Sequence, residues 1–578
     1  MKRYRLAVLL CVPLALVIAS AAAAHGVAEA APDAPSTAQP PAPPSAPATA
    51  APSATALPAP STTPPPPTPP PPAPPPPAPP PPAAPIASPA PTPRRARAAG
   101  SQARKQAANT SDATARMMPA GRFGTVAVYR PVGVPRSVAI FVSGDGGWKL
   151  GVTTMARALR DIGAVVIGID IRRYLASLRA TAQKPDAPCT SLAGDFETLS
   201  HRIQKNLGLA EYRVPVLVGY SSGATVVYAT LVQSPPGTFE GAISLGFCSD
   251  QEFGGATLCT GTGLHFSPGQ KGEIIIQPQN SLAQPWFALQ GQKDQVCSPS
   301  QVDAFAAQSG DSQVVKLASV GHGFGVERNW MPQFLESYNS IIARQEARRT
   351  ARPADIDDLP VNEVRDPTDT SNTFALLLTG DGGWAGLDQD LAERLAQEGV
   401  ATVGLNSLKY FWTQRPPQQA ANDVARVIRH YLAAWNKERV LLVGYSFGAD
   451  ALPFIVNRLP ADLKERVASV SLLGISANAS FEIRVADWIG ADSEGPPTRP
   501  ELAALVSGLN GKPNTKGPRV LCLYGEGDKD TICPDLTNGV AREPIGKGHH
   551  FSGQYATIAD RILAFARKSP PAPTIEQE

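Results

Sequence analysis

The feature that most constrains this 578-residue chain is a set of short motifs that occurs twice in the same order. An apolar run leads into Gly-Asp-Gly-Gly-Trp at 144–148 and again at 380–384. A later apolar run leads into Gly-Tyr-Ser-x-Gly at 219–223 and again at 444–448. The spacing between paired motifs is nearly constant, which is the mark of a tandem duplication. The chain therefore has to fold as one architecture built twice.

Strand-like and helix-like patterns alternate within each copy. In the second copy, Leu387, Leu391 and Leu395 recur at helical spacing. Apolar runs that read as strands occur at 138–143, 164–169 and 214–218 in the first copy and at 374–379, 400–405 and 440–443 in the second. Strands that alternate with helices indicate a parallel sheet covered on both faces. The predicted fold class is α/β, with two tandem domains.

The N-terminal part of the chain has a different composition. About half of the 61 prolines lie between Pro32 and Pro93, a stretch with almost no large apolar side chains, so it cannot bury enough surface to fold. We predict a disordered proline- and alanine-rich tether with a basic end. The complete predicted division is a signal peptide at 1–24, the tether at 25–118, a first domain at 119–345, a linker at 346–370, a second domain at 371–570 and a tail at 571–578.

The first residues predict export. Lys2, Arg3 and Arg5 precede an apolar run at 6–18, and the small residues at 21–24 supply a cleavage site. An uncleaved membrane anchor is the alternative. The expected location is the periplasm.

An even number of cysteines follows the predicted signal peptide, and in an oxidising compartment this favours disulfides. We predict Cys522–Cys533, Cys248–Cys259 and Cys189–Cys297. The sequence holds no metal-binding spacing of Cys and His, so we expect no metal and no cofactor. Lys and Arg total 52 against 49 Asp and Glu, a balance that does not indicate direct nucleic-acid binding.

The serine of each Gly-x-Ser-x-Gly motif is a candidate nucleophile. A serine hydroxyl needs a neighbouring base, and the flanking glycines allow the sharp strand-to-helix turn that exposes it. Ser221 and Ser446 each follow an apolar strand and are followed along the chain by an acid and then a histidine, which is the order of α/β-hydrolases. The alternative is that both serines occupy tight turns in a non-enzymatic domain.

The same logic assigns the partners of each serine. His322 and His549 are the predicted bases, and Asp294 is the predicted acid of the first copy. In the second copy Asp528 and Asp530 both follow a glycine by three positions. Asp530 is preferred because it alone shares the spacing to a following cysteine that Asp294 has, and Asp528 stays as the alternative. His550 is the rival base to His549.

Backbone N–H groups near each serine are candidates for an oxyanion hole. In the first copy these belong to Asp145, Gly146 and Ser222, and in the second copy to Asp381, Gly382 and Phe447. The alternative for the glycine motif is a plain turn.

These motifs carry a resemblance to a known family. The paired Gly-Asp-Gly-Gly-Trp loops, the Gly-Tyr-Ser-Phe-Gly-Ala-Asp run at 444–450, the aromatic cluster at 410–412 and the Gly-His-His-Phe loop at 548–551 resemble the bacterial virulence protein VirJ family. The two-copy arrangement is similar to that of AcvB, its longer relative. The resemblance covers roughly residues 120 to 570 and is most specific in the second copy.

The resemblance implies an α/β-hydrolase fold, a periplasmic location and hydrolysis of aminoacylated phospholipid, notably lysyl-phosphatidylglycerol, with a link to virulence and envelope homeostasis. Possible partners are the lipid at the membrane surface and secretion-system proteins. The first copy departs from the pattern, with Thr225 where the second has Asp450.

Asp450 follows Ser446 by four positions, so both share a helix face. We predict that it binds the lysyl ammonium, with stabilisation of the helix dipole as the alternative. Two other functions stay open: a general carboxylesterase or thioesterase, and a non-enzymatic scaffold for secretion partners.

Overall fold

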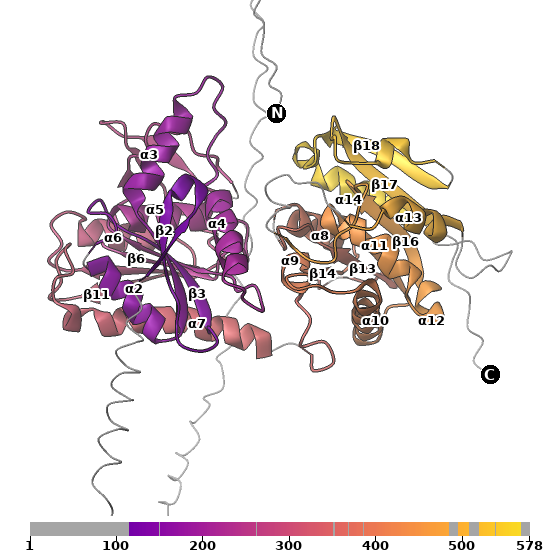
Figure 1. Cartoon of the computed structure of the whole chain (residues 1–578), viewed down its shortest axis with the longest axis horizontal. Coiled ribbons are helices and arrows are strands. Elements are labelled where there is room, and N and C mark those ends of the chain that lie inside the picture. Colours follow the sequence, from indigo (N-terminus) through magenta and orange to yellow (C-terminus); the bar gives the residue numbers. More distant parts are fainter. Residues whose placement is uncertain are drawn as a thin grey trace, which may run out of the picture. The chain divides into compact units, whose positions relative to one another are not determined.

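The computed structural model describes residues 115–567 except 150, 262, 351–352, 368, 385, 485–494, 508–518 and 538. The predicted signal peptide, most of the predicted tether and the tail lie outside the described residues. Each motif-bearing copy forms its own main sheet, and Figure 1 labels many of the helices and strands of both. We refer to them below as the first half and the second half.

The first half contains an eight-stranded sheet among its described residues, in the order β1-β2-β4-β3-β5-β6-β10-β11. The pairs from β4 to β11 are parallel, while β1 and β2 form an antiparallel edge. The strands are β1 (Arg116–Pro119), β2 (Thr125–Tyr129), β3 (Ser137–Val142), β4 (Ala164–Ile169), β5 (Val216–Tyr220), β6 (Gly241–Leu245), β10 (Trp286–Gly291) and β11 (Ser312–Leu317). A small separate sheet consists of β7 (Asp250–Gln251), β8 (Phe266–Pro268) and β9 (Ile274–Ile276).

Helices cover both faces of this sheet because successive strand side chains point to opposite sides. In β3, Val138 and Ile140 belong to one buried cluster, whereas Ala139 and Phe141 belong to the other. The first cluster includes side chains of α3 (Ile171–Ala182), α4 (Leu192–Asn206), α5 (Ser222–Gln233) and α6 (Pro299–Ala306). The second includes side chains of α2 (Gly151–Asp161) and α7 (Met331–Thr350).

The second half repeats this plan. Its seven-stranded sheet has the order β12-β14-β13-β15-β16-β17-β18 among the described residues, with β12 antiparallel at the edge and the other pairs parallel. The strands are β12 (Val361–Val364), β13 (Thr373–Leu378), β14 (Thr402–Leu405), β15 (Arg439–Tyr445), β16 (Val467–Leu473), β17 (Arg519–Glu526) and β18 (Val540–Lys547). The parallel run β14-β13-β15-β16-β17-β18 matches β4-β3-β5-β6-β10-β11, as a duplication requires.

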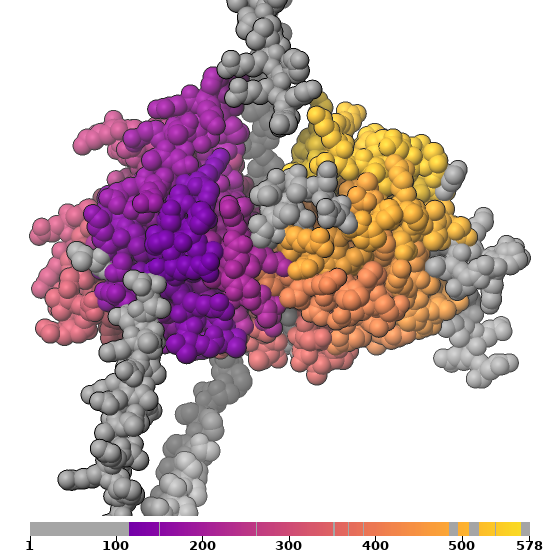
Figure 2. Space-filling model, viewed as in Figure 1, coloured from indigo at the N-terminus to yellow at the C-terminus, as the bar shows by residue number. Residues whose placement is uncertain are grey.

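The helices of the second half also divide between two faces. One buried cluster includes α10 (Pro417–Ala434), α11 (Phe447–Asn457) and α13 (Thr498–Ser507), and the other includes α8 (Leu387–Gln397) and α14 (Tyr555–Arg567). Short helices α9 (Ser407–Tyr410) and α12 (Ala461–Lys464) also lie in the second half, with 3₁₀ turns at Cys533–Asp535 and Phe551–Gly553. In the first half, 3₁₀ turns lie at Gly121–Phe123 and Glu327–Asn329. In Figure 2 the colours of the first half run from indigo to pink and those of the second from orange to yellow. Segments from the beginning and the end of each half therefore pack together.

The predicted α/β class is confirmed, and element limits differ from the predicted ones by a few residues. Strand β1 begins at Arg116 and helix α7 continues to Thr350, so the predicted domain limits at 119 and 345 fall within these elements. Within the part of the chain that the structure describes, no helix has the length and apolar character needed to span a membrane.

The three disulfides confirm one predicted pairing and correct two. Cys522 is bonded to Cys533 as predicted. Cys189 is bonded to Cys259 and Cys248 to Cys297, so the predictions Cys248–Cys259 and Cys189–Cys297 are wrong. Strands β6 and β10 are neighbours in the sheet, which brings together the loops after them that carry Cys248 and Cys297. An isolated β-bridge between Thr190 and Leu258 brings together their neighbours Cys189 and Cys259. Three disulfides are consistent with folding in an oxidising, exported environment.

Candidate active site

Each candidate nucleophile lies on a sharp turn between a strand and a helix. Ser221 separates β5 from α5, and Ser446 separates β15 from α11. Both serines have positive φ, 55° with ψ −124° for Ser221 and 50° with ψ −117° for Ser446. A non-glycine residue in such a conformation is strained by about 1–3 kcal/mol, and this kind of strain is concentrated at functional sites.

The glycines on either side of each serine are required by close backbone packing. A Cβ on Gly223 would lie 2.4 Å from the carbonyl oxygen of Val142, and one on Gly448 would lie 2.2 Å from that of Leu378. A Cβ on Gly219 would similarly lie 2.1 Å from the carbonyl oxygen of Gly223. The helix therefore starts directly against the neighbouring strand, and only glycine fits there.

In the second half the structure brings a serine, a histidine and an aspartate into one hydrogen-bonded chain. Ser446 Oγ lies 2.8 Å from His549 Nε2, and His549 Nδ1 lies 2.9 Å from Asp528 Oδ2. The Asp528 side chain is almost fully buried and His549 is partly exposed. The structure thus places Ser446 and His549 together as predicted, but the carboxylate that contacts His549 belongs to Asp528 and not to the predicted Asp530.

The first half forms the same chain with the predicted residues. Ser221 Oγ lies 2.9 Å from His322 Nε2, and His322 Nδ1 lies 2.9 Å from Asp294 Oδ2. The Asp294 carboxylate is fully buried. Its Oδ1 accepts hydrogen bonds from the backbone N–H groups of Val296 and Cys297.

The turn at the end of the strand explains why Asp528, and not Asp530, contacts His549. The N–H of Asp294 donates to the carbonyl of Gly291, and the N–H of Asp528 donates to that of Gly525 in the same way. Asp530 follows this turn by two residues, and its N–H donates to Asp528 Oδ1. The spacing from each aspartate to the following cysteine favoured Asp530, but the two cysteines are not equivalent. Cys297 forms a disulfide with the loop after β6, whereas Cys533 forms one with β17 itself.

A tyrosine before each serine supports the histidine loop, and the sequence argument assigned it no role. Tyr220 donates its hydroxyl to the carbonyl of His322 at 3.0 Å. The Tyr445 hydroxyl lies 3.0 Å from His550 Nδ1, which places His550 against Tyr445 while His549 faces the serine. Burial, and then the neighbouring His549, lower the pKa of His550. The signal that could have found these residues is the tyrosine shared by both Gly-Tyr-Ser motifs.

The glycine-rich loops lie beside the serines. A Cβ on Gly144 would come within 2.9 Å of Ser221 Cβ, and one on Gly380 within 3.7 Å of Ser446 Cβ. Ser222 donates its hydroxyl to Asp145 at 2.6 Å, which ties this loop to the start of α5. Ser222 and Phe447 are the first residues of their helices, where the backbone N–H has no partner within the helix. The oxyanion donors at Asp145, Gly146, Asp381 and Gly382 stay a prediction.

Asp450 lies in the first turn of α11 and its carboxylate is directed at the loop after β16. Asp450 Oδ1 accepts a hydrogen bond from the Ser476 N–H at 2.6 Å, and Oδ2 accepts one from the Ser476 hydroxyl at 2.7 Å. Burial raises the pKa of Asp450 to about 7, and these hydrogen bonds act against that rise. In the first half Thr225 donates its hydroxyl to the carbonyl of Cys248 at 2.6 Å. The two positions therefore contact equivalent loops.

The aromatic cluster of the second half is buried rather than exposed to a substrate. Phe411 packs against Phe447, beside the nucleophile turn, and Tyr410 donates its hydroxyl to Asp423. Trp412 donates its indole N–H to the carbonyl of Leu209 in the first half. These contacts give the cluster a packing role.

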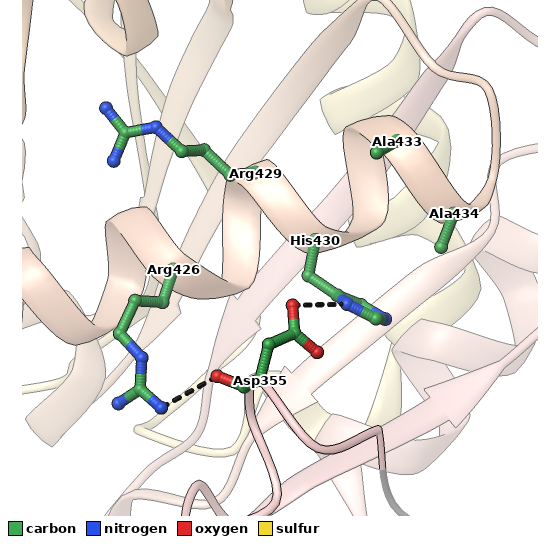
Figure 3. Close-up of a pocket in the computed structure, with 6 residues that line it drawn as sticks. All are labelled: Asp355, Arg426, Arg429, His430, Ala433 and Ala434. Atoms are coloured by element: carbon green, nitrogen blue, oxygen red, sulfur yellow. Dashed lines mark hydrogen bonds and ion pairs between the residues drawn. The ribbon is translucent and has the colours of Figure 1, made fainter.

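Two further polar groupings have partners of their own within the chain. Asp294, Cys297 and His322 lie close enough to hold a metal ion, but Cys297 is in a disulfide and the other two are bonded to each other. A surface hollow of about 710 Å³ lies along α10 (Figure 3). There His430 pairs with Asp355, and Arg426 donates to the Asp355 carbonyl. Because α10 precedes β15, its last turn lies toward the start of that strand, whereas Ser446 follows the strand's end.

Three solved structures to which the chain is similar each match less than half of it. The chain is similar to the esterase domain of a Rhodothermus marinus protein, with 16% identity over 37% of this chain and 91% of that one and a TM-score of 0.25. It is similar to Est1E from Butyrivibrio proteoclasticus, with 11% identity over 40% of this chain and 100% of that one and a TM-score of 0.28. It is also similar to an alpha-beta serine hydrolase homologue from Coxiella burnetii, with 17% identity over 40% of this chain and 97% of that one and a TM-score of 0.26. No curated protein matches the sequence.

The comparison with protein families is more informative. The family described as bacterial virulence protein (VirJ) matches residues 136–243 and 372–569, together more than half of the chain. The second segment contains Ser446, Asp528 and His549, whereas the first contains Ser221 without Asp294 and His322. Because this match covers more than half of the chain, the chain belongs to the bacterial virulence protein VirJ family.

Proposed function

We propose that this protein is an exported serine hydrolase of carboxylic esters, with Ser446, His549 and Asp528 as its main catalytic residues. The observation that carries the proposal is the continuous hydrogen-bonded chain from Ser446 through His549 to Asp528 on a strained turn. The first half holds an equivalent chain, so we propose Ser221, His322 and Asp294 as a second set. Ser446 is placed first because the family match spans the whole second set.

The reaction follows from the positions of these groups. His549 Nε2 takes the proton of the Ser446 hydroxyl as Oγ attacks the ester carbonyl, and Asp528 orients the ring and stabilises the imidazolium. The oxyanion that forms faces the N–H of Phe447 and the loop at Asp381 and Gly382. The imidazolium then protonates the leaving alcohol, and water releases the acid from Ser446 by the same steps.

The proposed substrate is the aminoacyl ester of an aminoacylated phosphatidylglycerol, in particular lysyl-phosphatidylglycerol, cleaved at the periplasmic membrane surface. Its hydrolysis would give free lysine and phosphatidylglycerol. Resemblance to the VirJ family supports this choice, and the three disulfides support an exported location. The proposal gives Asp450 no contact with the lysyl ammonium, because both of its carboxylate oxygens already accept hydrogen bonds from Ser476.

The test measures lysine release from vesicles containing lysyl-phosphatidylglycerol and turnover of a neutral p-nitrophenyl ester. We expect Ser446→Ala to lose most of both activities and Ser446→Ala with Ser221→Ala to lose the remainder, since removing the nucleophile costs orders of magnitude in rate. Turnover of the p-nitrophenyl ester alone would make the protein a general esterase. Full cellular function in the double variant would make it a scaffold, and either result contradicts the proposal.

A further inference from the structure

The loop after β16 forms one wall of the second site. Gly474 has a φ of +67°, and a Cβ there would lie 3.1 Å from His549 Cε1 and 3.8 Å from Asp528 Oδ2. The imidazole and its acid therefore pack directly against this loop. Any movement of the loop changes the space that holds the His549 ring.

The same loop is attached to the segment that carries the acid. Ser476 and Thr531 form a β-bridge, and the N–H of Ile532 and the Thr531 hydroxyl both donate to the carbonyl of Ile475, at 2.8 and 3.0 Å. Thr531 follows Asp528 by three residues. The loop thus joins the base and the acid without a covalent bond.

The first half makes this junction with sulfur. Cys248 follows Gly246 by two residues, as Ser476 follows Gly474, and Cys297 follows Asp294 by three, as Thr531 follows Asp528. The disulfide Cys248–Cys297 therefore occupies the place of the Ser476–Thr531 bridge. A Cβ on Gly246 would lie 3.3 Å from His322 Cε1, so the glycine contact with the base is also the same.

The second half lacks that disulfide and instead has a carboxylate beneath the loop. Asp450 reaches from the first turn of α11 and accepts two hydrogen bonds from Ser476, at 2.6 and 2.7 Å. Its own N–H donates to the carbonyl of Ser446 at 3.0 Å. Asp450 therefore connects the turn of the nucleophile to the loop that supports the base.

We propose that Asp450 and Ser476 are positioning residues of the second site, which hold the Gly474–Ser476 loop against His549 and Asp528 as the Cys248–Cys297 disulfide holds its counterpart in the first site. This inference rests on the proposed hydrolase function for its kinetic test. The carboxylate acts through the loop and does not touch the substrate. Loss of Asp450 should therefore slow the reaction equally for cationic and neutral esters.

The experiment uses the full chain with Ser221→Ala, so that only the second site turns over. Asp450→Ala, Asp450→Asn and the surface control Asp462→Ala are assayed on lysyl-phosphatidylglycerol vesicles and on p-nitrophenyl butyrate. We expect Asp450→Ala to lower kcat at least tenfold on both substrates with KM unchanged. Asn at this position can accept from the Ser476 N–H and donate to its hydroxyl oxygen, so Asp450→Asn should keep most of the activity. Asp462→Ala should match the parent.

Hydrogen exchange supplies a readout that does not need turnover. The amides of Ser476 and Ile532 should exchange faster in Asp450→Ala and at the parental rate in Asp450→Asn. A loss confined to the lysyl substrate would overturn the proposal and make Asp450 an ammonium ligand. Unchanged kcat or unchanged exchange in Asp450→Ala would also overturn it. A parent that hydrolyses neither ester refutes the proposed function, while the exchange measurement still decides the role of Asp450.

Discussion

The choice of acid in the second site depends on two aspartates that are two positions apart. Asp528 lies in the turn that follows Gly525 and contacts His549, while the backbone of Asp530 donates to Asp528. In the proposed mechanism a carboxylate at Nδ1 stabilises the imidazolium, and Asp528 is the aspartate whose side chain contacts that atom. The two side chains provide a matched pair for a test.

In the Ser221→Ala background we expect Asp528→Asn to lower kcat by several orders of magnitude, on the order of 10⁴, because an amide cannot hold the histidine in the right tautomer. Asp530→Asn should leave kcat within about twofold. Steady-state hydrolysis of p-nitrophenyl butyrate by both variants decides this. A larger loss in Asp530→Asn than in Asp528→Asn would contradict the assigned triad.

Asp450 also links stability to pH. Burial raises the pKa of its carboxyl from the usual 3.8 to about 7, and the nearby Asp381 adds to the rise. Between about pH 4 and pH 7 the unfolded chain releases this proton while the folded chain keeps it, so the free energy of unfolding falls as pH increases. Asp450→Asn removes that contribution. We expect the variant to gain stability relative to the parent from pH 4.5 to pH 8 in urea unfolding, and parallel pH curves would contradict this.

At the scale of elements, the turn between strand and helix fixes both the nucleophile and its neighbours. Gly223 sits where a Cβ would lie 2.4 Å from the Val142 carbonyl oxygen, whereas Gly323 has no heavy atom within 4 Å of its Cβ position. Gly223→Ala must therefore move α5 away from β3, while Gly323→Ala has open space. We expect Gly223→Ala to cost about 1–3 kcal/mol of stability, as overpacking does, and Gly323→Ala much less, measured by denaturant unfolding. Equal costs would mean that α5 shifts freely.

The β-bridge between the loop after β16 and the segment after Asp528 can be replaced by a disulfide, as in the first half. Ser476 and Thr531 face each other across a β-bridge, a geometry that brings Cα atoms within the range of a disulfide. We expect Ser476→Cys with Thr531→Cys to form a bond between these two residues and to restore the activity lost in Asp450→Ala. Oxidised glutathione takes up the two protons and two electrons of the thiols as it is reduced, and dithiothreitol returns them and should abolish the rescue. Peptide mapping of the unreduced protein checks the pairing, and a correctly paired variant without rescue would contradict the positioning role.

Most of the elements that carry the site could be predicted from the sequence. The apolar runs at 138–143 and 374–379 became β3 and β13, and the doubled Gly-x-Ser-x-Gly motif placed Ser221 and Ser446 between strand and helix. The predictions that the structure does not bear out, two disulfide pairings and the choice of Asp530 as the partner of His549, depended on contacts between loops that are distant in the sequence. The acid of the second half was assigned by its distance to a cysteine, and the two cysteines used for that comparison have different kinds of partner. Sequence spacing does not show which loops meet at the sheet edge.

At the scale of the whole molecule, the disulfides close loops of very different length. Cys189 and Cys259 are separated by 70 residues, and Cys522 and Cys533 by 11. In the chain-entropy model these cross-links stabilise the folded state by about 4 and about 3 kcal/mol, respectively. We expect Cys189→Ala with Cys259→Ala to lower the free energy of unfolding more than Cys522→Ala with Cys533→Ala, measured in guanidinium chloride. The reverse order would show that native-state packing around Cys522 and Cys533 outweighs loop length.

The strained backbone at Ser221 and Ser446 has a consequence for how the two halves evolve. Both serines have φ values near +50°, which glycine adopts without strain. Replacement of either serine by glycine would relieve the backbone strain but would also remove the hydroxyl. Stability therefore favours glycine at this position, whereas nucleophilic chemistry requires serine. A half that had lost its catalytic role would drift toward the relaxed residue. Serine at both turns is what the proposed nucleophilic chemistry requires of each half, at the cost of a strained backbone.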